Sequence, residues 1–413
     1  MALTSPRTQS WDQKLTMLVV VAFGFVPLLL AFSRAGADIV ITGIGVLFLV
    51  RSAFTRQWEW LKRPDIMVLT ILWLYLMAGA LTAADPETSL IKSLIWGRMV
   101  LFFAAATSWI LVSSKHLSLI CRIILPTLLF LMVDTAWQYI TSVSLSGNPK
   151  FGHRLSGPLS SYNIGNLLLK TSIPVLCFWF YRAYQSSHKP QMLLSLIGLM
   201  AIAALVVISG ERSIGILMFL GMSGLFGFLF LYQPKIRKYV FGYATIMAAI
   251  ITLLFSTQIP TQQRSAEFLK TMGSFWDSHY GELFRNAYAL WKEHPITGLG
   301  VGGFRNHCDA MMEKINTTHC AIHPHNIYLE WLSETGIIGL VLFITAMAII
   351  VQRFVKHQLM QMPHILAAGS VAMFIILLFP IIGTQSAFAN WPAILFWFSL
   401  SMTIGLSQSS KNG

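Results

Sequence analysis

The chain has 413 residues, of which 55% are hydrophobic and only 11% are charged, and its mean hydropathy is +0.65. Soluble domains carry about 25% charged residues, so this composition excludes a soluble protein. The formal net charge of +13 would suggest nucleic-acid binding in a soluble chain. In a membrane protein, basic residues anchor cytoplasmic loops, so we expect membrane lipids and no nucleic acid as partners.

Apolar runs of about twenty residues recur along almost the whole chain, which fits neither a single-anchor enzyme nor a β-barrel of short alternating strands. The first run has basic flanks like those of a signal peptide, but the many later runs favour a signal anchor. We predict an all-α, polytopic membrane protein with spans at 15–33, 37–50, 66–83, 93–112, 117–140, 164–181, 191–209, 214–232, 239–256, 336–352, 364–383 and 390–407.

Basic residues lie on both sides of the predicted spans. With the N-terminus in the cytoplasm every predicted inside loop is positive, and the C-terminus is cytoplasmic as well. The opposite, outer face also carries many cations, which orientation does not explain. A cation at membrane depth costs on the order of 2.5–3.5 kcal/mol, so it usually faces a polar cavity or a partner. We therefore predict a basic cavity that opens to the outer face.

Several cations are candidates for this cavity by their position along the chain. Arg34 and Lys92 could instead extend to the lipid headgroups. Glu211 could pair with Arg212 and make its turn structural, or the turn could present the guanidinium to a phosphate group. The candidates are Lys92 and Arg98 at the start of the fourth span, Arg154 before the sixth, Lys170 within the sixth, and Arg212 in a tight turn between the seventh and eighth.

We divide the chain into three parts: residues 1–256 with nine spans, an outer loop domain at 257–335, and residues 336–413 with three spans and a short cytoplasmic tail. The loop domain is the only long stretch rich in charge. Within it, residues 282–293 predict an amphipathic helix that ends at His294 and Pro295, with Leu283, Ala287, Leu290 and Trp291 on its apolar face. Residues 326–334 predict a second helix, and an outer loop at 143–162 is expected to be irregular.

The loop domain contains five of the eleven histidines, at His294, His307, His319, His323 and His325. A zinc site would need a better set of ligands, because there is no HExxH helix and no carboxylate lies between His319 and Glu330. We therefore predict no metal site.

The cysteines and glycines of the chain support two further expectations. Cys308 and Cys320 lie in the loop domain, where a disulfide could close the loop, whereas Cys121 and Cys177 lie inside spans and are expected to be core thiols. The glycine-rich run at 298–304 lacks the Lys-Ser/Thr of a phosphate-binding loop, so we expect a flexible loop. No nucleotide or other cofactor is predicted.

With metal and nucleotide sites set aside, the candidate for chemistry is a histidine in a basic environment on the outer face. Neutral imidazole is a competent base near neutral pH, and guanidinium groups bind phosphate oxygens through charge-assisted bonds. Transfer from a lipid diphosphate needs both functions, because a base must remove the acceptor proton and cations must stabilise the departing diphosphate. Taken alone, His325 could instead have a structural role, either capping the backbone at the start of a helix or lying at the lipid interface.

Four motifs resemble the O-antigen ligase and polymerase superfamily. The first is HNIYLEWLSETGIIG, which begins at His325, and the second is FRNAYALWKEHPITGLGVGGF, which contains Arg285. SGERSIGIL around Arg212 and RLSGPLSSYNIGN from Arg154 resemble two further family segments. A departure is Tyr162 followed by Asn163, where many relatives have Pro-Asn.

The resemblance implies roles for particular residues. His325 would be the catalytic base, and Arg212 and Arg285 would hold the diphosphate of an undecaprenyl-linked glycan. Family members are inverting glycosyltransferases that use neither nucleotide nor metal and act on the periplasmic face of the bacterial inner membrane. Further candidates for substrate binding, inferred from position, are Arg98, Lys92, Arg154, Lys170 and Asn326.

The resemblance leaves the acceptor open. A ligase of lipopolysaccharide biosynthesis transfers the glycan to lipid A core, a polymerase transfers it to another lipid-linked glycan, and a protein O-oligosaccharyltransferase transfers it to Ser or Thr. We favour the ligase on chain length and the single large outer loop, and the short C-terminal tail argues against protein glycosylation. A transporter for an anionic lipid is a further alternative, but it would be expected to show inverted repeats.

Overall fold

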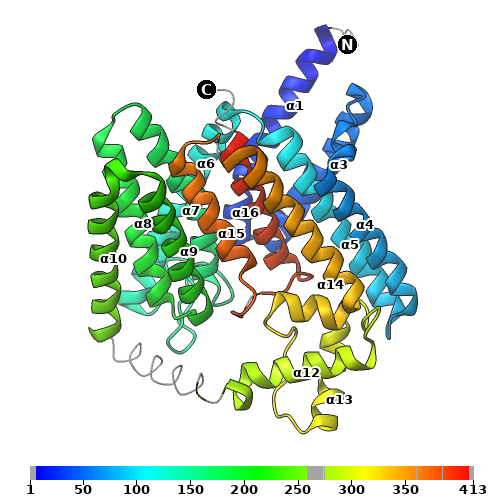
Figure 1. Cartoon of the computed structure of the whole chain (residues 1–413). Coiled ribbons are helices and arrows are strands. Elements are labelled where there is room, and N and C mark those ends of the chain that lie inside the picture. Colours follow the sequence, from blue (N-terminus) through cyan, green and yellow to red (C-terminus); the bar gives the residue numbers. More distant parts are fainter. Residues whose placement is uncertain (1–5, 258–272, 274, 360, 384, 409–413) are drawn as a thin grey trace.

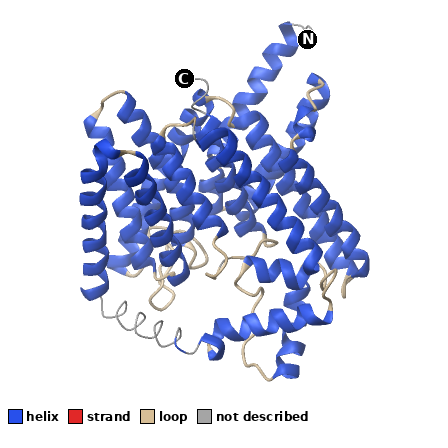
Figure 2. Ribbon diagram, in the orientation of Figure 1, coloured by secondary structure: helices blue, strands red, loops and turns tan. Residues whose placement is uncertain are grey.

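The computed structural model describes residues 6–257, 273, 275–359, 361–383 and 385–408. This part of the chain is helical and contains no strand beyond two isolated bridges in the loop after α6 (Figure 2). The predicted all-α class is therefore confirmed. The main helices are α1 (Pro6–Gly24), α2 (Val26–Phe32), α3 (Arg34–Thr55), α4 (Pro64–Gly79), α5 (Pro86–Ala105), α6 (Ser114–Thr141), α7 (Ile164–Gln185), α8 (Lys189–Ser209), α9 (Arg212–Tyr232), α10 (Arg237–Thr257), α12 (His279–Glu293), α13 (Gly303–Ile315), α14 (Ile327–Phe354), α15 (His364–Leu378) and α16 (Asn390–Gln408).

The predicted count of twelve spans is not confirmed, although a helix overlaps each predicted range. Among the described residues nine helices are long and apolar enough to cross a membrane, or ten if α1 and α2, which meet at an angle of 43°, form one span. Pro27 at the start of α2 lacks the N–H that a continuous helix would need there. Helix α15 is apolar but shorter, and α16 carries four buried polar side chains, Ser399, Ser401, Thr403 and Ser407.

The described ends of the chain lie at one end of the bundle, and α12 and α13 lie at the opposite end (Figure 1). Helix α7 is central, since it packs against α8, α15 and α16 and 78% of its most apolar stretch is buried. The peripheral α10 contacts α8 and α9, and only 11% of its most apolar stretch is buried. The predicted tail beyond residue 408 and residues 258–272 of the loop domain lie outside the described residues.

The loop domain has a small core of its own. The predicted helix at 282–293 is confirmed as α12, which buries Leu283, Ala287 and Leu290 against α13 and ends at His294. Cys308 and Cys320 form a disulfide, and Cys121 and Cys177 are buried thiols, as expected. The loop at 143–162 is irregular, as expected.

The expectation of a flexible glycine-rich loop at 298–304 is wrong. This stretch is buried, and the carboxylate of Glu334 accepts hydrogen bonds from the backbone N–H of Gly302 (2.6 Å) and Phe304 (3.3 Å). The backbone N–H of Val301 donates to Ser89 Oγ at 2.9 Å. Glycine is favoured at position 302 because its φ is +85°, and a Cβ there would also displace the Lys92 side chain, whose Nζ would lie 2.0 Å away.

The predicted span at 364–383 ends early. Helix α15 stops at Leu378, and the described residues between it and the start of α16 at Asn390, 379–383 and 385–389, are non-helical. Pro380 explains the stop, because proline drives the preceding residue out of the helical region and Phe379 is extended. We call these described residues, 379–383 and 385–389, the unwound segment. Non-helical backbone at membrane depth is tolerated only where protein buries it or where it lines a cavity, so this segment marks a site of interest.

Helix α14 joins the predicted helix at 326–334 to the predicted tenth span, with a break at Gly336 (φ +66°, ψ −172°). The backbone N–H of Ile337 donates to Pro295 O at 3.0 Å. A Cβ at position 336 would lie 2.1 Å from Ile296 O. The break is therefore fixed against the end of α12.

We predict that Gly336→Ala destabilises the folded protein by about 2 kcal/mol or more, because alanine would combine left-handed backbone with a clash against backbone. Thermal unfolding in detergent would measure the loss. Gly227→Ala on α9 is the matched control, since its Cβ meets nothing within 4 Å, and it should be neutral or slightly stabilising. Equal unfolding temperatures for the two variants would contradict the prediction.

Candidate functional site

His325 lies immediately before α14 with φ +54°, a left-handed conformation that histidine adopts more readily than most residues. Its ring lies 4.2 Å from the ring of His323 and 5.7 Å from that of Tyr280, centroid to centroid. Burial, followed by the charges of His323, His279 and Arg154, lowers the pKa of His325 to about 3. The imidazole is therefore neutral at physiological pH and has a nitrogen available as a base.

Asn326 holds His325 in place. Its Oδ1 accepts hydrogen bonds from the backbone N–H of Tyr328 (3.0 Å) and Leu329 (3.1 Å), which caps the start of α14. Its Nδ2 donates to Pro380 O at 2.8 Å. These contacts use both ends of the buried amide, so they favour a positioning role. Binding of substrate by Asn326 stays a prediction.

Gly383 of the unwound segment brings three elements of the site together. A Cβ at this position would lie 3.2 Å from His325 O, 3.2 Å from Ser213 Oγ and 3.5 Å from the ring of Tyr280. The residue that follows Arg212 is thus a near neighbour of the residue that carries the imidazole. The starts of α9, α12 and α14 converge on this glycine.

Arg212 begins α9 directly after the turn that the sequence predicted, in which Gly210 has φ +79°. The neighbouring Glu211 is directed to another helix, because its carboxylate accepts a hydrogen bond from the backbone N–H of Gly165 at the start of α7 (2.6 Å). Burial raises the pKa of Glu211 to about 8, against the opposing effects of Gly165, Asn166, Arg154 and Lys170. Near neutral pH it therefore neutralises little of the surrounding positive charge.

Arg154 lies over the ring of Tyr162, with Cζ 4.7 Å from the centroid. It is close enough to His325 and to Glu211 to interact with both electrostatically. The backbone N–H of Leu155 donates to Ser209 O at 3.0 Å, which attaches this loop to the turn before Arg212. Tyr162 therefore supports the guanidinium of Arg154.

Lys170 on α7 is only 8% exposed and lines a small cavity of about 20 Å³ inside the bundle. Its side chain makes no hydrogen bond or ion pair with the residues that the structure describes, and Glu211 is the acid that interacts with it electrostatically. Gln385, whose side chain pairs with Asn166 at 2.5 Å, lines the cavity from the unwound segment. The other lining residues are Trp96, Ile327, Trp331, Phe343, Leu377, Ser386, Ala387, Pro392, Ala393, Phe396 and Trp397.

Two predicted site residues belong to other charge networks. Arg98 Nη2 lies 2.8 Å from Asp38 Oδ1 and 2.8 Å from Asn390 Oδ1, which ties α5 to α3 and α16. Lys92 lies against Gly302 and is attracted by two buried acids of α14, Glu330 and Glu334. Within the described residues neither cation contacts His325, Arg212 or Arg154, so both have structural partners, and substrate binding by them stays a prediction.

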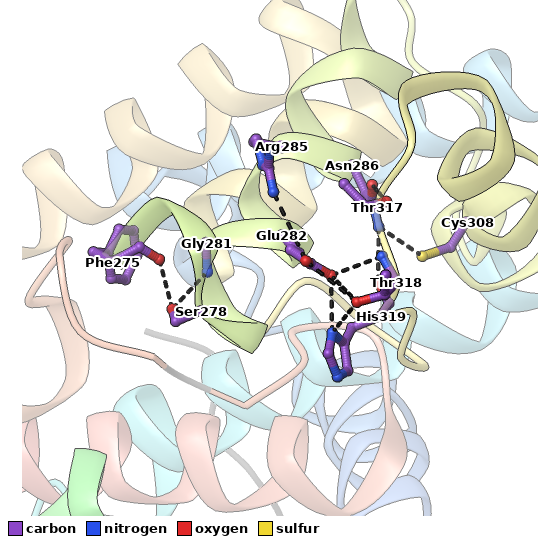
Figure 3. Close-up of polar contacts among 10 residues, drawn as sticks. All are labelled: Phe275, Ser278, Gly281, Glu282, Arg285, Asn286, Cys308, Thr317, Thr318 and His319. Carbon is purple, nitrogen blue, oxygen red and sulfur yellow. Dashed lines mark hydrogen bonds and ion pairs between the residues drawn. The ribbon is translucent and has the colours of Figure 1, made fainter. Parts of the chain in front are cut away.

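Arg285 on α12 is only loosely held (Figure 3). Its Nη2 lies 3.8 Å from Glu282 Oε1, its Nε is buried without a hydrogen bond to the described residues, and its side chain is 40% exposed. Tyr280, which contacts His325, is five residues earlier on the same helix, about 7.5 Å along the axis. Five residues correspond to about 140° of rotation, so Arg285 lies on a different side of α12 from Tyr280. Its weak ion pair with Glu282 leaves the guanidinium available for an anion.

Three further residues near the site were not singled out from the sequence: Tyr280, Gly383 and Glu282. The spacing of Glu282 and Arg285 is the one local signal, since residues three apart share a helix face. Nothing in the sequence relates Gly383 to position 325. Among the described residues no three His, Cys, Asp or Glu side chains are grouped to hold a metal ion.

The geometry defines a multi-pass helical membrane protein with a neutral histidine close to Arg154 and to the start of α9. Residues 196–344 match the family model described as O-antigen ligase. This stretch contains Arg212, Arg285 and His325, and it confirms the resemblance to the O-antigen ligase superfamily over that part of the chain. No curated protein matches the chain. The match supports, for this part of the chain, an enzyme of the glycosyltransferase-like class.

The left-handed backbone of His325 generates a stability prediction. His325→Gly and His325→Ala both remove the imidazole, but only alanine retains the Cβ penalty of a positive φ. We expect the alanine variant to be less stable than the glycine variant by about 1 kcal/mol. Thermal unfolding in detergent measures the difference, and a glycine variant that is the less stable of the two would contradict it.

The lowered pKa of His325 predicts the pH dependence of catalysis. With a pKa of about 3, the imidazole of the free enzyme stays neutral as the pH falls from 7 to 5. The acid limb of kcat/KM that belongs to this base should therefore lie below pH 5. Profiles of the wild type and of His325→Gln would be compared, and a limb near pH 6.5 that is absent in the variant would contradict the assignment.

Proposed function

We propose that the protein is an O-antigen ligase, an inverting glycosyltransferase that moves a glycan from undecaprenyl diphosphate to lipid A core. The reaction takes place on the periplasmic face of the bacterial inner membrane and needs neither nucleotide nor metal. The observation that carries the proposal is the neutral imidazole of His325, which lies beside Arg154 and the start of α9 within the stretch matched by the family model.

In this mechanism His325 removes the proton of the acceptor hydroxyl. The oxygen attacks the anomeric carbon from the face opposite the diphosphate, so the configuration inverts. The electron pair of the broken carbon–oxygen bond leaves with the diphosphate, and the new negative charge is stabilised by Arg212 and Arg285. Arg285 suits this role because its contact with Glu282, at 3.8 Å, is weak enough to be exchanged for a phosphate oxygen.

Donor binding would also activate the base. Arg154 is one of the charges that lower the pKa of His325. A diphosphate bound at Arg154 and Arg212 would offset this charge and raise the basicity of the imidazole. The site therefore favours binding of the donor before the acceptor. Lys170 adds a buried positive charge on the same side of the bundle.

The proposal is tested with purified protein, an undecaprenyl-diphosphate-linked glycan and lipid A core, in EDTA and without nucleotide. We expect glycan transfer to lipid A core. His325→Ala should lower kcat by about 10²–10⁴-fold, the range for loss of a general base. Arg285→Ala should lower it by about 10²–10³-fold, as for loss of one group that stabilises a leaving charge.

Arg305→Ala is the matched control, since Arg305 is an exposed arginine on α13 in the same loop domain. It should transfer at the wild-type rate. Extension of the lipid-linked glycan in place of transfer to lipid A core would identify a polymerase. Absence of any transfer by folded wild-type protein would overturn the proposal and favour an anionic-lipid transporter.

A further inference from the structure

The loop domain contains a carboxylate–histidine pair that the proposed mechanism does not use (Figure 3). Nδ1 of His319 lies 2.8 Å from Glu282 Oε2. The same carboxylate accepts hydrogen bonds from the backbone N–H and the hydroxyl of Thr318, at 2.8 and 3.0 Å. Burial works against ionisation of Glu282, but the hydrogen bonds from Thr318 and His319 outweigh it and hold the pKa of Glu282 at about 2.

This contact sets the tautomer of His319. A carboxylate that accepts a hydrogen bond from Nδ1 leaves the lone pair on Nε2, which is the form of an imidazole that can accept a proton. The side chain of His319 is 50% exposed, so Nε2 can exchange protons with water. Arg285 lies on the other side of Glu282 in Figure 3 and contacts the second carboxylate oxygen.

The backbone that carries His319 is fixed to α12 at several points. Asn286 Nδ2 donates to His319 O at 2.9 Å, and Asn286 Oδ1 accepts from the hydroxyl of Thr317 at 2.7 Å. The next residue, Cys320, forms the disulfide with Cys308. So many constraints on one half-exposed imidazole indicate that its position matters.

A row of rings, those of His319, His279 and Tyr280, leads from this pair to His325. The rings of His319 and His279 meet edge to face at 4.6 Å between centroids. His279 is exposed and interacts electrostatically with both His319 and His325. Tyr280, the next residue of α12, contacts the ring of His325. The titratable and charged groups that act on this row are Glu282, Arg285, His323 and Arg154.

We propose that His279 and the Glu282–His319 pair form a proton relay, which carries the proton taken up by His325 to solvent. This inference rests on the proposed glycosyl transfer, which releases one proton for each new glycosidic bond. The proton passes from His325 through water to the exposed His279, then to Nε2 of His319, and from there to solvent. Each imidazole returns to its neutral form, so no other reactant is needed.

The relay has a physical reason. His325 is surrounded by groups that disfavour its protonated form, so a proton left on it must depart before the next cycle. His319 lies beside the carboxylate of Glu282 and its side chain is half exposed. The proton thus moves from a buried site where it is disfavoured to a position that is open to water. His279 and His319 are positioning residues for proton release, since they do not touch the substrates.

The test uses the full-length enzyme, without reductant, in the transfer assay described above. At low buffer concentration His319→Gln should lower kcat about tenfold, less than loss of the base itself. Glutamine can keep the hydrogen bond to Glu282 but cannot accept a proton from His279. Added imidazole should restore kcat, because the position is open to solvent, and the KM for the donor should stay within about twofold of the wild-type value.

His279→Gln should show the same loss of kcat and the same recovery with imidazole. It provides an independent test if the change at position 319 affects folding. His294→Gln, the same substitution at an exposed histidine at the end of α12, should behave as wild type. Full activity of His319→Gln and His279→Gln at every buffer concentration, or a loss that imidazole does not restore, would overturn the relay alone. Failure of the wild type to transfer would overturn the proposed function and the relay with it.

Discussion

Two buried carboxylates one turn apart on α14 hold together the non-helical parts of the chain around His325. Glu330 accepts hydrogen bonds from Ser386 Oγ (2.5 Å) and the backbone N–H of Ala387 (2.6 Å), both in the unwound segment. Glu334 binds two backbone N–H groups of the glycine-rich loop. Each acid is 2% exposed. Removing either would leave buried donors without partners, a cost of about 1–3 kcal/mol for each donor.

The sequence predicts structure well where local periodicity decides it. The apolar face of α12, the turn before Arg212 and the helix that follows His325 all appear where they are expected. It fails where distant residues decide the outcome. In the sequence, Glu330 and Glu334 belong to the charged stretch that predicts a soluble loop domain. In the fold, both are buried against backbone donors that are remote in sequence.

The early end of α15 has a different cause. Residues 379–383 stay apolar, and hydropathy measures the transfer of side chains, whereas backbone hydrogen bonding decides whether a helix continues. In the sequence, Pro380 was the local signal that the helix ends there. The predicted cations fall into two groups for a similar reason. The sequence shows that a residue is charged, but its neighbours in the fold determine whether that charge is paired or available to the site. Arg98 has Asp38 and Asn390 as partners, and Lys92 has two acids, whereas Arg154 has an aromatic ring and leaves its charge available to His325.

The break at Gly336 also divides α14 into two parts whose orientations depend on different surroundings. The part of α14 after the break can follow the tilt that the bilayer thickness imposes on a membrane helix. The part before it is attached to α12 and to the unwound segment. At the break, the backbone N–H of Ile337 donates its hydrogen bond to Pro295 O. The depth of His325 relative to the lipid headgroups is thus set by the loop domain, so membranes of different thickness should present the same imidazole to their lipid-linked substrates.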